Sequence, residues 1–348
     1  MLRDVRMGFL KPRLLGFNYK TASNVVTMNA GVGSAVISSS AAGTASHTFT
    51  RSFARRGLFV ATAGSDVANA AYVGGTNNTF PTALGFSPIA RNASASNTDG
   101  TVHCLHLGFD SLETLRFKQD ANVVRSEFDQ GVLQAFRYNS TTPTILNGAR
   151  QFSIVKSGTG DVTLTFKNAP SGSKNCVVCA IPVSASALVC NISTVSGLSV
   201  RILTFSTAGS ATDAQVNVLV YQDAQGPSEK VSCTPLMSSQ RKPILFGYSV
   251  LYASGAPTLE SVLGSTDVTI ANTATGRVTF TFAQGFQRAP VMIATAINNT
   301  ATRYCTIDNV SNTAFEVKNW SSAPALANPT DGSGFQVIGI GFNDATEY

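Results

Sequence analysis

An internal repeat constrains this chain of 348 residues more than any other feature of its sequence. Residues 49–63 read FTRSFARRGLFVATA and residues 282–296 read FAQGFQRAPVMIATA, with two Phe, one Arg and the final Ala-Thr-Ala in register. The separation in sequence between these two segments, from residue 49 to residue 282, also separates LHLGFD at residues 105–110 from IGIGFN at residues 338–343. Equal spacing between two matched ends indicates a duplicated fold rather than a chance similarity of two strands.

A third, more diverged copy lies between these two. Residues 161–166 read DVTLTF and resemble RVTFTF at residues 277–282, while NVLVYQD at residues 217–223 takes the place of the closing strand. Each copy carries Thr-Asp shortly before that strand, and in two of them, at residues 99–100 and 331–332, Asp is followed by Gly, which predicts a tight turn. These pairs are Thr98-Asp99, Thr212-Asp213 and Thr330-Asp331. The predicted organisation is repeat 1 (1–110), a charged linker or arm (111–130), repeat 2 (131–223), a linker (224–240) and repeat 3 (241–348).

Strand patterns recur along the chain. Residues 277–282 alternate apolar and polar side chains, which is typical of a half-buried strand. Residues 175–183 and 290–296 are continuously apolar, which predicts strands covered on both faces. Residues 307–320 predict a hairpin with its turn at residues 311–313. We therefore expect an all-β protein of three tandem β-sandwich domains, of the jelly-roll or lectin-like type.

The composition favours the same fold class. Charged residues make up only 13% of the chain, and Ser, Thr, Asn and Gly, which suit turns and sheet surfaces, supply most of its polarity. Residues 111–130 are the one helix candidate because charged side chains are frequent there. An extended arm is the alternative for this segment, and we favour the arm.

The charge distribution makes some partners improbable. The net charge is +6, yet the basic residues are sparse, with the densest groups at residues 51–56 and 241–242. A nucleic-acid site needs Lys and Arg concentrated on one face, so we expect no specific nucleic-acid partner. The charged first residues leave no room for a signal peptide, and no apolar run is long enough to span a membrane. We expect a soluble protein made in a cytoplasm.

Six cysteines are spread over the chain without a secretory signal, so we expect free buried thiols. Two of them, Cys176 and Cys179, lie three residues apart in a predicted strand. That spacing sends their side chains to opposite faces and makes a shared metal improbable.

No catalytic constellation is apparent. All three histidines, His47, His103 and His106, lie in repeat 1, and we expect His103 and His106 to be exposed or lightly packed rather than metal ligands. The sequence has no nucleophile elbow and no phosphate-binding loop. We expect no enzyme activity, no catalytic residue, no cofactor and no metal.

A few residues are candidates for contacts. Trp320 is the only tryptophan, and it is either a contact aromatic or, as we favour, part of the packing. The basic start of the chain could dock on a neighbouring protein; its residues are Arg3, Arg6, Lys11 and Arg13.

Residues 276–342 resemble the H-type lectin-like β-sandwich. The resemblance lies in a Phe-rich strand at 278–282, an apolar strand after Pro at 290–296, an Asn-Val-Ser hairpin at 309–311 and a closing strand at 337–342. Where such lectins carry a sugar-contacting aromatic pattern, this chain has Gly-Ile-Gly-Phe at residues 339–342. For that reason no binding residue is carried over.

As a whole, the chain resembles virion proteins of tailed bacteriophages, in which small β-sandwiches rich in Gly, Ser, Thr and Asn are common. The resemblance implies a structural protein of the virion that decorates or cements the capsid, made in the host cytoplasm. Its implied partners are the major capsid protein or neighbouring copies, and we expect a homo-oligomer. The alternative is a glycan-binding adhesin or a tail fibre component with lectin-like domains.

Overall fold

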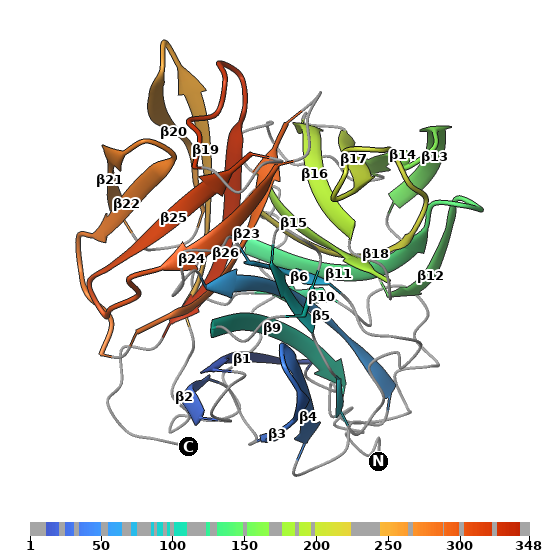
Figure 1. Ribbon diagram of the computed structural model, residues 1–348, viewed down its shortest axis with the longest axis horizontal. Helices are drawn as coiled ribbons and strands as arrows, with labels where there is room; N and C mark the ends of the chain where they lie inside the picture. Colours follow the sequence, from blue (N-terminus) through green and yellow to red (C-terminus); the bar gives the residue numbers. More distant parts are fainter. Residues whose placement is uncertain are drawn as a thin grey trace, which may run out of the picture.

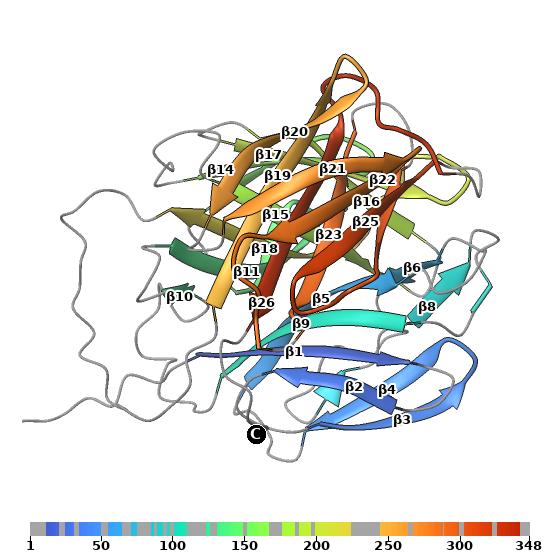
Figure 2. The same ribbon diagram turned by 90° about the vertical axis from the view of Figure 1, so that its left-hand side faces the viewer.

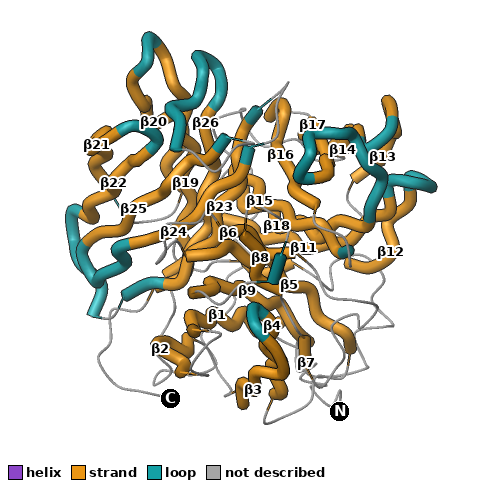
Figure 3. The backbone as a smooth tube through the Cα atoms, in the orientation of Figure 1, coloured by secondary structure: helices purple, strands orange, loops and turns teal. Residues whose placement is uncertain are grey.

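The computed structural model of this chain is all-β, and no helix occurs among the residues that it describes (Figure 3). The described residues are 12–20, 25–30, 35–49, 55–64, 71–74, 85–86, 89–92, 96–97, 101–109, 123–125, 131–148, 152–166, 176–184, 188–195, 199–223, 244–263, 267–287, 289–298, 303–321 and 326–341. The predicted fold class is confirmed.

The strands fall into three groups along the chain. Repeat 1 contains β1 (Pro12–Lys20), β2 (Val25–Ala30), β3 (Ala35–Ala41), β4 (Thr44–Phe49), β5 (Arg55–Gly64), β6 (Ala71–Gly74), β7 (Gly85–Phe86), β8 (Ile89–Asn92) and β9 (Thr101–Phe109). After β10 (Val123–Arg125), repeat 2 contains β11 (Gly131–Asn139), β12 (Thr144–Gly148), β13 (Phe152–Gly158), β14 (Asp161–Phe166), β15 (Cys176–Val183), β16 (Leu188–Val195), β17 (Ser199–Ser206) and β18 (Gln215–Asp223). Repeat 3 contains β19 (Ile244–Ala253), β20 (Ala256–Leu263), β21 (Val268–Ala274), β22 (Arg277–Phe282), β23 (Val291–Ile297), β24 (Tyr304–Asp308), β25 (Ala314–Trp320) and β26 (Gly334–Gly341).

The strand order is the same in all three repeats. The first strand pairs with the second and the last, and the last pairs with the fifth, which gives β2-β1-β9-β5, β12-β11-β18-β15 and β20-β19-β26-β23. The other strands form a second sheet, in the orders β3-β4-β8-β6, β13-β14-β17-β16 and β21-β22-β25-β24. The repeat in sequence is therefore a repeat in topology. That each repeat folds as a separate domain, with the predicted boundaries, stays a prediction.

One turn recurs in all three repeats. Gly43, Gly160 and Gly276 each follow the third strand and have φ of 68°, 64° and 67°, a conformation that glycine adopts without strain. Their carbonyl oxygens accept hydrogen bonds from the backbone N–H groups of Ala90, Thr204 and Asn319, at 2.8, 2.8 and 2.7 Å. The next residue in each case forms an isolated bridge six residues ahead; the bridges are Arg91↔Asn97, Phe205↔Ala211 and Trp320↔Leu326. Because the same turn is held by the same bonds, a shared origin accounts for it.

In each of repeats 2 and 3 the two sheets pack face to face around a core of their own, as in a β-sandwich. Along β22, Val278, Phe280 and Phe282 are buried, which confirms the predicted alternation. The ring of Phe280 stacks on Phe315 with centroids 4.4 Å apart and an interplanar angle of 10°. Phe246 on the opposite sheet meets Phe282 edge to face at 5.6 Å. Aromatic pairs of this kind add to the area buried.

The sheets of repeats 2 and 3 are joined into one eight-stranded sheet. The connection is a parallel pairing of β16 with β23 through Ile192 and Ile297. It is extended by a 2.9 Å hydrogen bond from the Asn298 N–H to the Ile192 carbonyl. The backbone ladder therefore crosses the boundary between two repeats.

Three predictions about strands can be compared with the structure. The hairpin at residues 307–320 is confirmed, with β24 and β25 paired from Asp308↔Glu316 to Tyr304↔Trp320. β15 and β23 are almost completely buried, as their apolar sequences predict. Within the predicted linker at 111–130, Val123–Arg125 form the extended strand β10, which pairs with β11 and fits the arm rather than the helix. The rest of that linker lies outside the described residues, as does the linker at 224–240.

The three repeats surround a common centre. Figure 1 shows the blue strands of repeat 1, the green and yellow strands of repeat 2 and the orange and red strands of repeat 3 around a middle occupied by β5, β15 and β23. Figure 2 shows from the side that β5 and β9 lie directly below β23 and β26. β5, β15 and β23 are the fifth strands of their repeats, and each contacts the other two.

Candidate functional site

The place where the three fifth strands meet is here called the axial junction, and it consists of residues 61–63 on β5, 180–182 on β15 and 294–296 on β23. The strands around it meet in the same way at each of the three contacts between neighbouring repeats, which are here called seams. Between repeats 1 and 3, β5 contacts β24 and β23 contacts β9. Between repeats 3 and 2, β23 contacts β16 and β15 contacts β26, and between repeats 2 and 1, β15 contacts β6 and β5 contacts β18. The repeats are therefore related by an approximate threefold axis.

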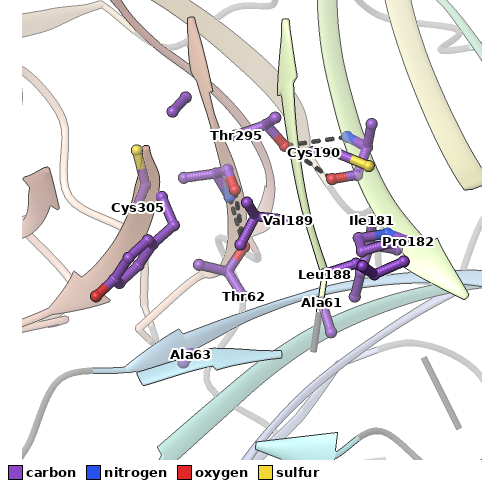
Figure 4. A pocket seen from close by; sticks show the side chains of 14 residues that line it. Ala61, Thr62, Ala63, Ile181, Pro182, Leu188, Val189, Cys190, Thr295 and Cys305 are labelled. Atoms are coloured by element: carbon purple, nitrogen blue, oxygen red, sulfur yellow. Dashed lines mark hydrogen bonds between the residues drawn. The ribbon is translucent and has the colours of Figure 1, made fainter. Parts of the chain in front are cut away.

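A threonine side chain bonds the backbone of the neighbouring repeat at two of these seams (Figure 4). The Thr62 hydroxyl donates to the carbonyl oxygen of Ala294 at 3.1 Å and accepts from the N–H of the same residue at 2.8 Å. In the same way the Thr295 hydroxyl donates to the Ala180 carbonyl at 3.3 Å and accepts from the Ala180 N–H at 3.0 Å. Ile181 holds the equivalent position on β15 and has no hydroxyl. This pair of threonine hydrogen bonds is thus made at two seams out of three.

These bonds serve strands that lie at or near a sheet edge. β5 and β15 each end their sheet, and β23 meets its second neighbour β16 at a single residue pair. The backbone groups on such an edge must find partners when they are buried. A hydroxyl both donates and accepts, so one threonine satisfies the N–H and the C=O of one residue. The threonine hydroxyls thus pair backbone groups of β23 and β15, whereas the equivalent position facing β5 is Ile181.

The closing strand contributes a buried polar side chain near the junction in each repeat. The Gln336 amide oxygen accepts a 2.6 Å hydrogen bond from the Val178 N–H on β15, and its amide nitrogen donates to the Ser249 hydroxyl at 3.3 Å. Asn217 holds the equivalent position in repeat 2 and accepts a 2.7 Å hydrogen bond from Arg137. His103 holds it in repeat 1. Gln336, Asn217 and His103 are all buried. The closing strand that carries each of them contacts the fifth strand of a neighbouring repeat.

The prediction that His103 and His106 are exposed or lightly packed is therefore wrong for both. His103 is 1% exposed and His106 is 0% exposed. The physical reason is that β9 contacts β1 and β5 within its own repeat and β23 across the seam. The side chain of His47 is outside the part of the chain that the structure describes.

A small, partly open pocket lies at the axial junction (Figure 4). Its volume is about 40 Å³. Its lining combines the three fifth strands with residues of β16 and β24; the side chains beyond the junction itself are Leu188, Val189, Cys190, Tyr304 and Cys305. Ligand pockets usually measure about 300–1,000 Å³, so this pocket has room for a few water molecules at most.

Five described cysteines are free and buried, as the sequence predicts, and Cys233 lies outside the described residues. Cys176 packs in the core of repeat 2, whereas the Cys179 thiol points to the carbonyls of Ile293 and Gln336 at 3.7 Å, so the two lie on opposite faces of β15. Burial raises the pKa of the Cys179 and Cys190 thiols to about 12. It also raises the pKa of Cys176 and Cys305. A thiol must lose its proton to act as a nucleophile, so these groups are poor candidates for catalysis.

We expect the five buried thiols to resist alkylation in the folded protein. Iodoacetamide at pH 8 followed by intact-mass measurement should show at most one label on the native chain, at Cys233, and six after unfolding in guanidinium. Peptide mapping identifies the labelled residues. Rapid native labelling of Cys179 or Cys190 would show that the axial junction opens readily.

The tight turn predicted before the closing strand is confirmed in repeat 3, whereas Thr212 and Asp213 of repeat 2 lie in an irregular segment without a turn. Asp331 and Gly332 form a turn before β26, and the Asp331 carboxylate accepts a 3.2 Å hydrogen bond from the Gly255 N–H. Asp213 precedes β18 and accepts hydrogen bonds from the Gly160 N–H at 2.7 Å, the Ser140 hydroxyl at 3.2 Å and Lys156 at 2.5 Å. Thr98 and Asp99 lie outside the described residues. Asp213 thus ties the turn at Gly160 to the start of the closing strand.

Replacing Asp213 with Asn is expected to lower the free energy of unfolding by about 1–2 kcal/mol at pH 7. Burial tends to raise the pKa of the Asp213 carboxyl, but the hydrogen bonds from Lys156, Gly160 and Ser140 outweigh it and lower this pKa below its ordinary value. A depressed pKa in the folded state stabilises the protein above the unfolded pKa, and this contribution is lost as the pH falls through the folded value.

The difference between wild type and D213N should therefore shrink as the pH falls below about 4. Urea unfolding at a series of pH values measures it. Asp331→Asn is the matched control, since Asp331 makes one long hydrogen bond in an exposed turn, and it should cost only a few tenths of a kcal/mol. A difference that stays constant from pH 7 to pH 3 would contradict a charge-dependent role.

Gly247 on β19 lies where repeat 3 contacts repeat 2. A Cβ at this position would lie 2.9 Å from Cδ1 of Tyr221 and 3.3 Å from Cβ of Val177, both in repeat 2 and both fully buried. Gly247→Val is expected to destabilise the protein by about 1–3 kcal/mol through overpacking at this seam. Gly158→Ala is the control, because its nearest atom is 3.8 Å away, and it should change the stability by less than about 0.5 kcal/mol. Equal urea midpoints for the two variants would disprove the close contact.

Of the predicted contact residues, the structure describes the side chain of Trp320. Trp320 is 6% exposed, stacks on Tyr304 with centroids 6.5 Å apart and donates a 2.9 Å hydrogen bond to the Thr306 hydroxyl. It forms a small cluster with Val189 of repeat 2, which agrees with the packing role that we favoured. Arg13 is on β1, but its side chain is outside the described part of the chain, and so are Arg3, Arg6 and Lys11 entirely.

Comparison with protein-family models, with curated protein sequences and with solved structures gives no match. Among the described residues, no group of three His, Cys, Asp or Glu is placed to hold a metal ion. Nor does that part of the chain contain a helix with the length and hydropathy needed to cross a bilayer. The axial junction is therefore the feature from which a function has to be argued.

Proposed function

We propose that this chain is a non-enzymatic structural protein of a phage virion, which decorates or cements the surface of the capsid. The observation that supports the proposal best is the axial junction, where three β-sandwich-like repeats of one chain close around a shared axis. This arrangement of three repeats is complete as soon as the single chain has folded. It offers a rigid body with several related outer faces, which suits permanent contacts in a large particle.

The surface chemistry also fits permanent assembly. The chain has few charges, and its polarity comes mostly from Ser, Thr, Asn and Gly. Outward-facing hydroxyls recur on the fourth strands, at Thr163 on β14 and at Thr279 and Thr281 on β22. Contacts made by such groups vary little with salt, unlike contacts between charged patches. A lasting attachment to a particle benefits from that property.

The described reactive groups favour a structural role over catalysis. The five described thiols are buried, and burial holds the pKa of four of them far above the ordinary value. The glycan-binding alternative loses its candidate aromatic, because Trp320 is committed to packing against Tyr304 and Val189. The structural role is for this reason the function we put forward.

Purified particles of the phage that encodes the chain provide the test. We expect the chain to remain with the particles through gradient purification at a fixed copy number. Particles made without the gene should release their DNA at a lower temperature, and adding the purified chain should restore the wild-type value. Absence of the chain from the particles would overturn the proposal. Reproducible binding to a glycan array with no effect on particle stability would favour the adhesin instead.

A further inference from the structure

The three seams of the axial junction have the symmetry of a closed ring of identical subunits. Two strand contacts recur at each seam. The fifth strand of one repeat contacts the sixth strand of its neighbour, and the fifth strand of that neighbour contacts the closing strand of the first repeat. Head-to-tail contacts of this kind generate a ring when the rotation closes. Here the ring closes at three units, and all three belong to one chain.

The bonding at the seams repeats with the contacts. Thr62 bonds the backbone of Ala294, and Thr295 bonds the backbone of Ala180, so the same side chain makes the same two hydrogen bonds at successive seams. At the third seam Ile181 replaces the threonine. A homotrimer would have three identical seams, whereas a single chain can change one of them alone. The arrangement is that of a homotrimer whose subunits have been joined and have then diverged.

A body with this symmetry presents the same elements three times around its axis. The turns before the fourth strands are an example, since Ala42, Thr159 and Thr275 are all exposed and each precedes one of the glycines that accept the recurring hydrogen bond. A partner with one matching surface can meet one repeat only. A partner with three matching surfaces around its own axis can meet all three, and contacts made by one rigid body reinforce each other without the entropy cost of separate binding events.

We infer that the chain occupies positions of local threefold symmetry on the particle, with one chain for every three copies of the partner subunit around each occupied axis. This inference rests on the proposed function and adds the symmetry of the partner surface. The whole chain should be monomeric in solution, in place of the homo-oligomer that the resemblance implied, because the trimer contacts are made within it. Because its repeats are similar, it can be seated in three orientations that differ by a rotation of about a third of a turn.

The test combines two measurements on the complete protein. The first is the mass of the purified chain in solution, for which we expect the monomer value of 36.4 kDa. The second is a particle reconstruction, with focused classification of the bound density without imposed symmetry, together with quantitative mass spectrometry of copy numbers. We expect density for one chain on local threefold axes and one chain for three partner subunits at each of them.

The outcomes separate this inference from the function on which it rests. A chain that is present in particles but lies on a twofold axis, a fivefold axis or a general position, or that binds each partner subunit singly, would overturn the inference and leave the function intact. So would a homotrimer of whole chains whose own axis coincides with that of the particle. A chain missing from the particles would overturn both.

Discussion

Replacing Thr62 and Thr295 together with valine is expected to lower the free energy of unfolding by about 2–5 kcal/mol. Valine keeps the shape of threonine but has no hydroxyl. Each substitution removes a donor and an acceptor, so the backbone N–H and C=O of Ala294 and of Ala180 lose the partner that the neighbouring repeat supplies. Leaving such groups without partners is expensive at the buried Ala180 and costs less at the part-buried Ala294. Urea unfolding followed by circular dichroism measures the loss.

A serine pair provides the matched control. Thr62→Ser with Thr295→Ser keeps both hydroxyls and removes one methyl group at each site, which should cost about 1–2 kcal/mol in total. Ile181→Val tests the third seam, where no hydroxyl is present, and should cost about 0.5–1.5 kcal/mol from lost packing alone. If the valine pair were as stable as the serine pair, the hydrogen bonds at the seams would contribute nothing measurable.

The elements of the fold could be predicted because their signals are local. The alternation in residues 277–282 follows from the two faces of β22, and the unbroken apolar runs follow from the burial of β15 and β23 on both faces. Matching positions in the repeats predicted matching strands, and the strand order confirms the match. Such patterns depend on neighbours within a few residues of each other.

The axial junction could not be predicted because its contacts join residues far apart in the sequence. Thr62 and Ala294 are 232 residues apart, and neither residue type indicates a contact with the other. One signal was present: Ala-Thr-Ala is kept in repeats 1 and 3, although threonine is uncommon in the middle of a strand buried on both faces. A buried hydroxyl needs hydrogen-bond partners, so the two threonines indicate polar backbone groups close to them in the fold.

The histidines show the same limit. The residue type of His103 by itself indicates an intermediate degree of burial. Its position in the repeat carried more information, since Asn217 and Gln336 hold the equivalent places on the closing strands. Three different polar residues at one buried position indicate a shared requirement for hydrogen bonding there.

The joined sheet leads to a second large effect, on how the repeats unfold. Leu164 lies in the core of repeat 2 and Phe280 in the core of repeat 3, and both are fully buried. Leu164→Ala is expected to cost about 2–5 kcal/mol and Phe280→Ala about 3–5 kcal/mol. Because the eight-stranded sheet and the bonds of Thr295 connect the two repeats, we expect either substitution to shift one common transition.

The single tryptophan allows this to be measured. Trp320 belongs to repeat 3, and its cluster includes Val189 of repeat 2, so its fluorescence reports the loss of that seam. Far-ultraviolet circular dichroism reports the strands of the whole chain. Coincident urea midpoints for the two signals in wild type, L164A and F280A would show that repeats 2 and 3 unfold together.

The contrary result would also be informative. L164A could instead split the dichroism curve into two transitions, one at a lower urea concentration, and leave the fluorescence midpoint unchanged. Repeat 2 would then unfold as an independent domain, as the sequence alone suggests. The single residue pair between β16 and β23 would then be too weak to couple the two cores. The connection through Ile192, Ile297 and Thr295 therefore decides whether this chain behaves as one body or as three domains in a row.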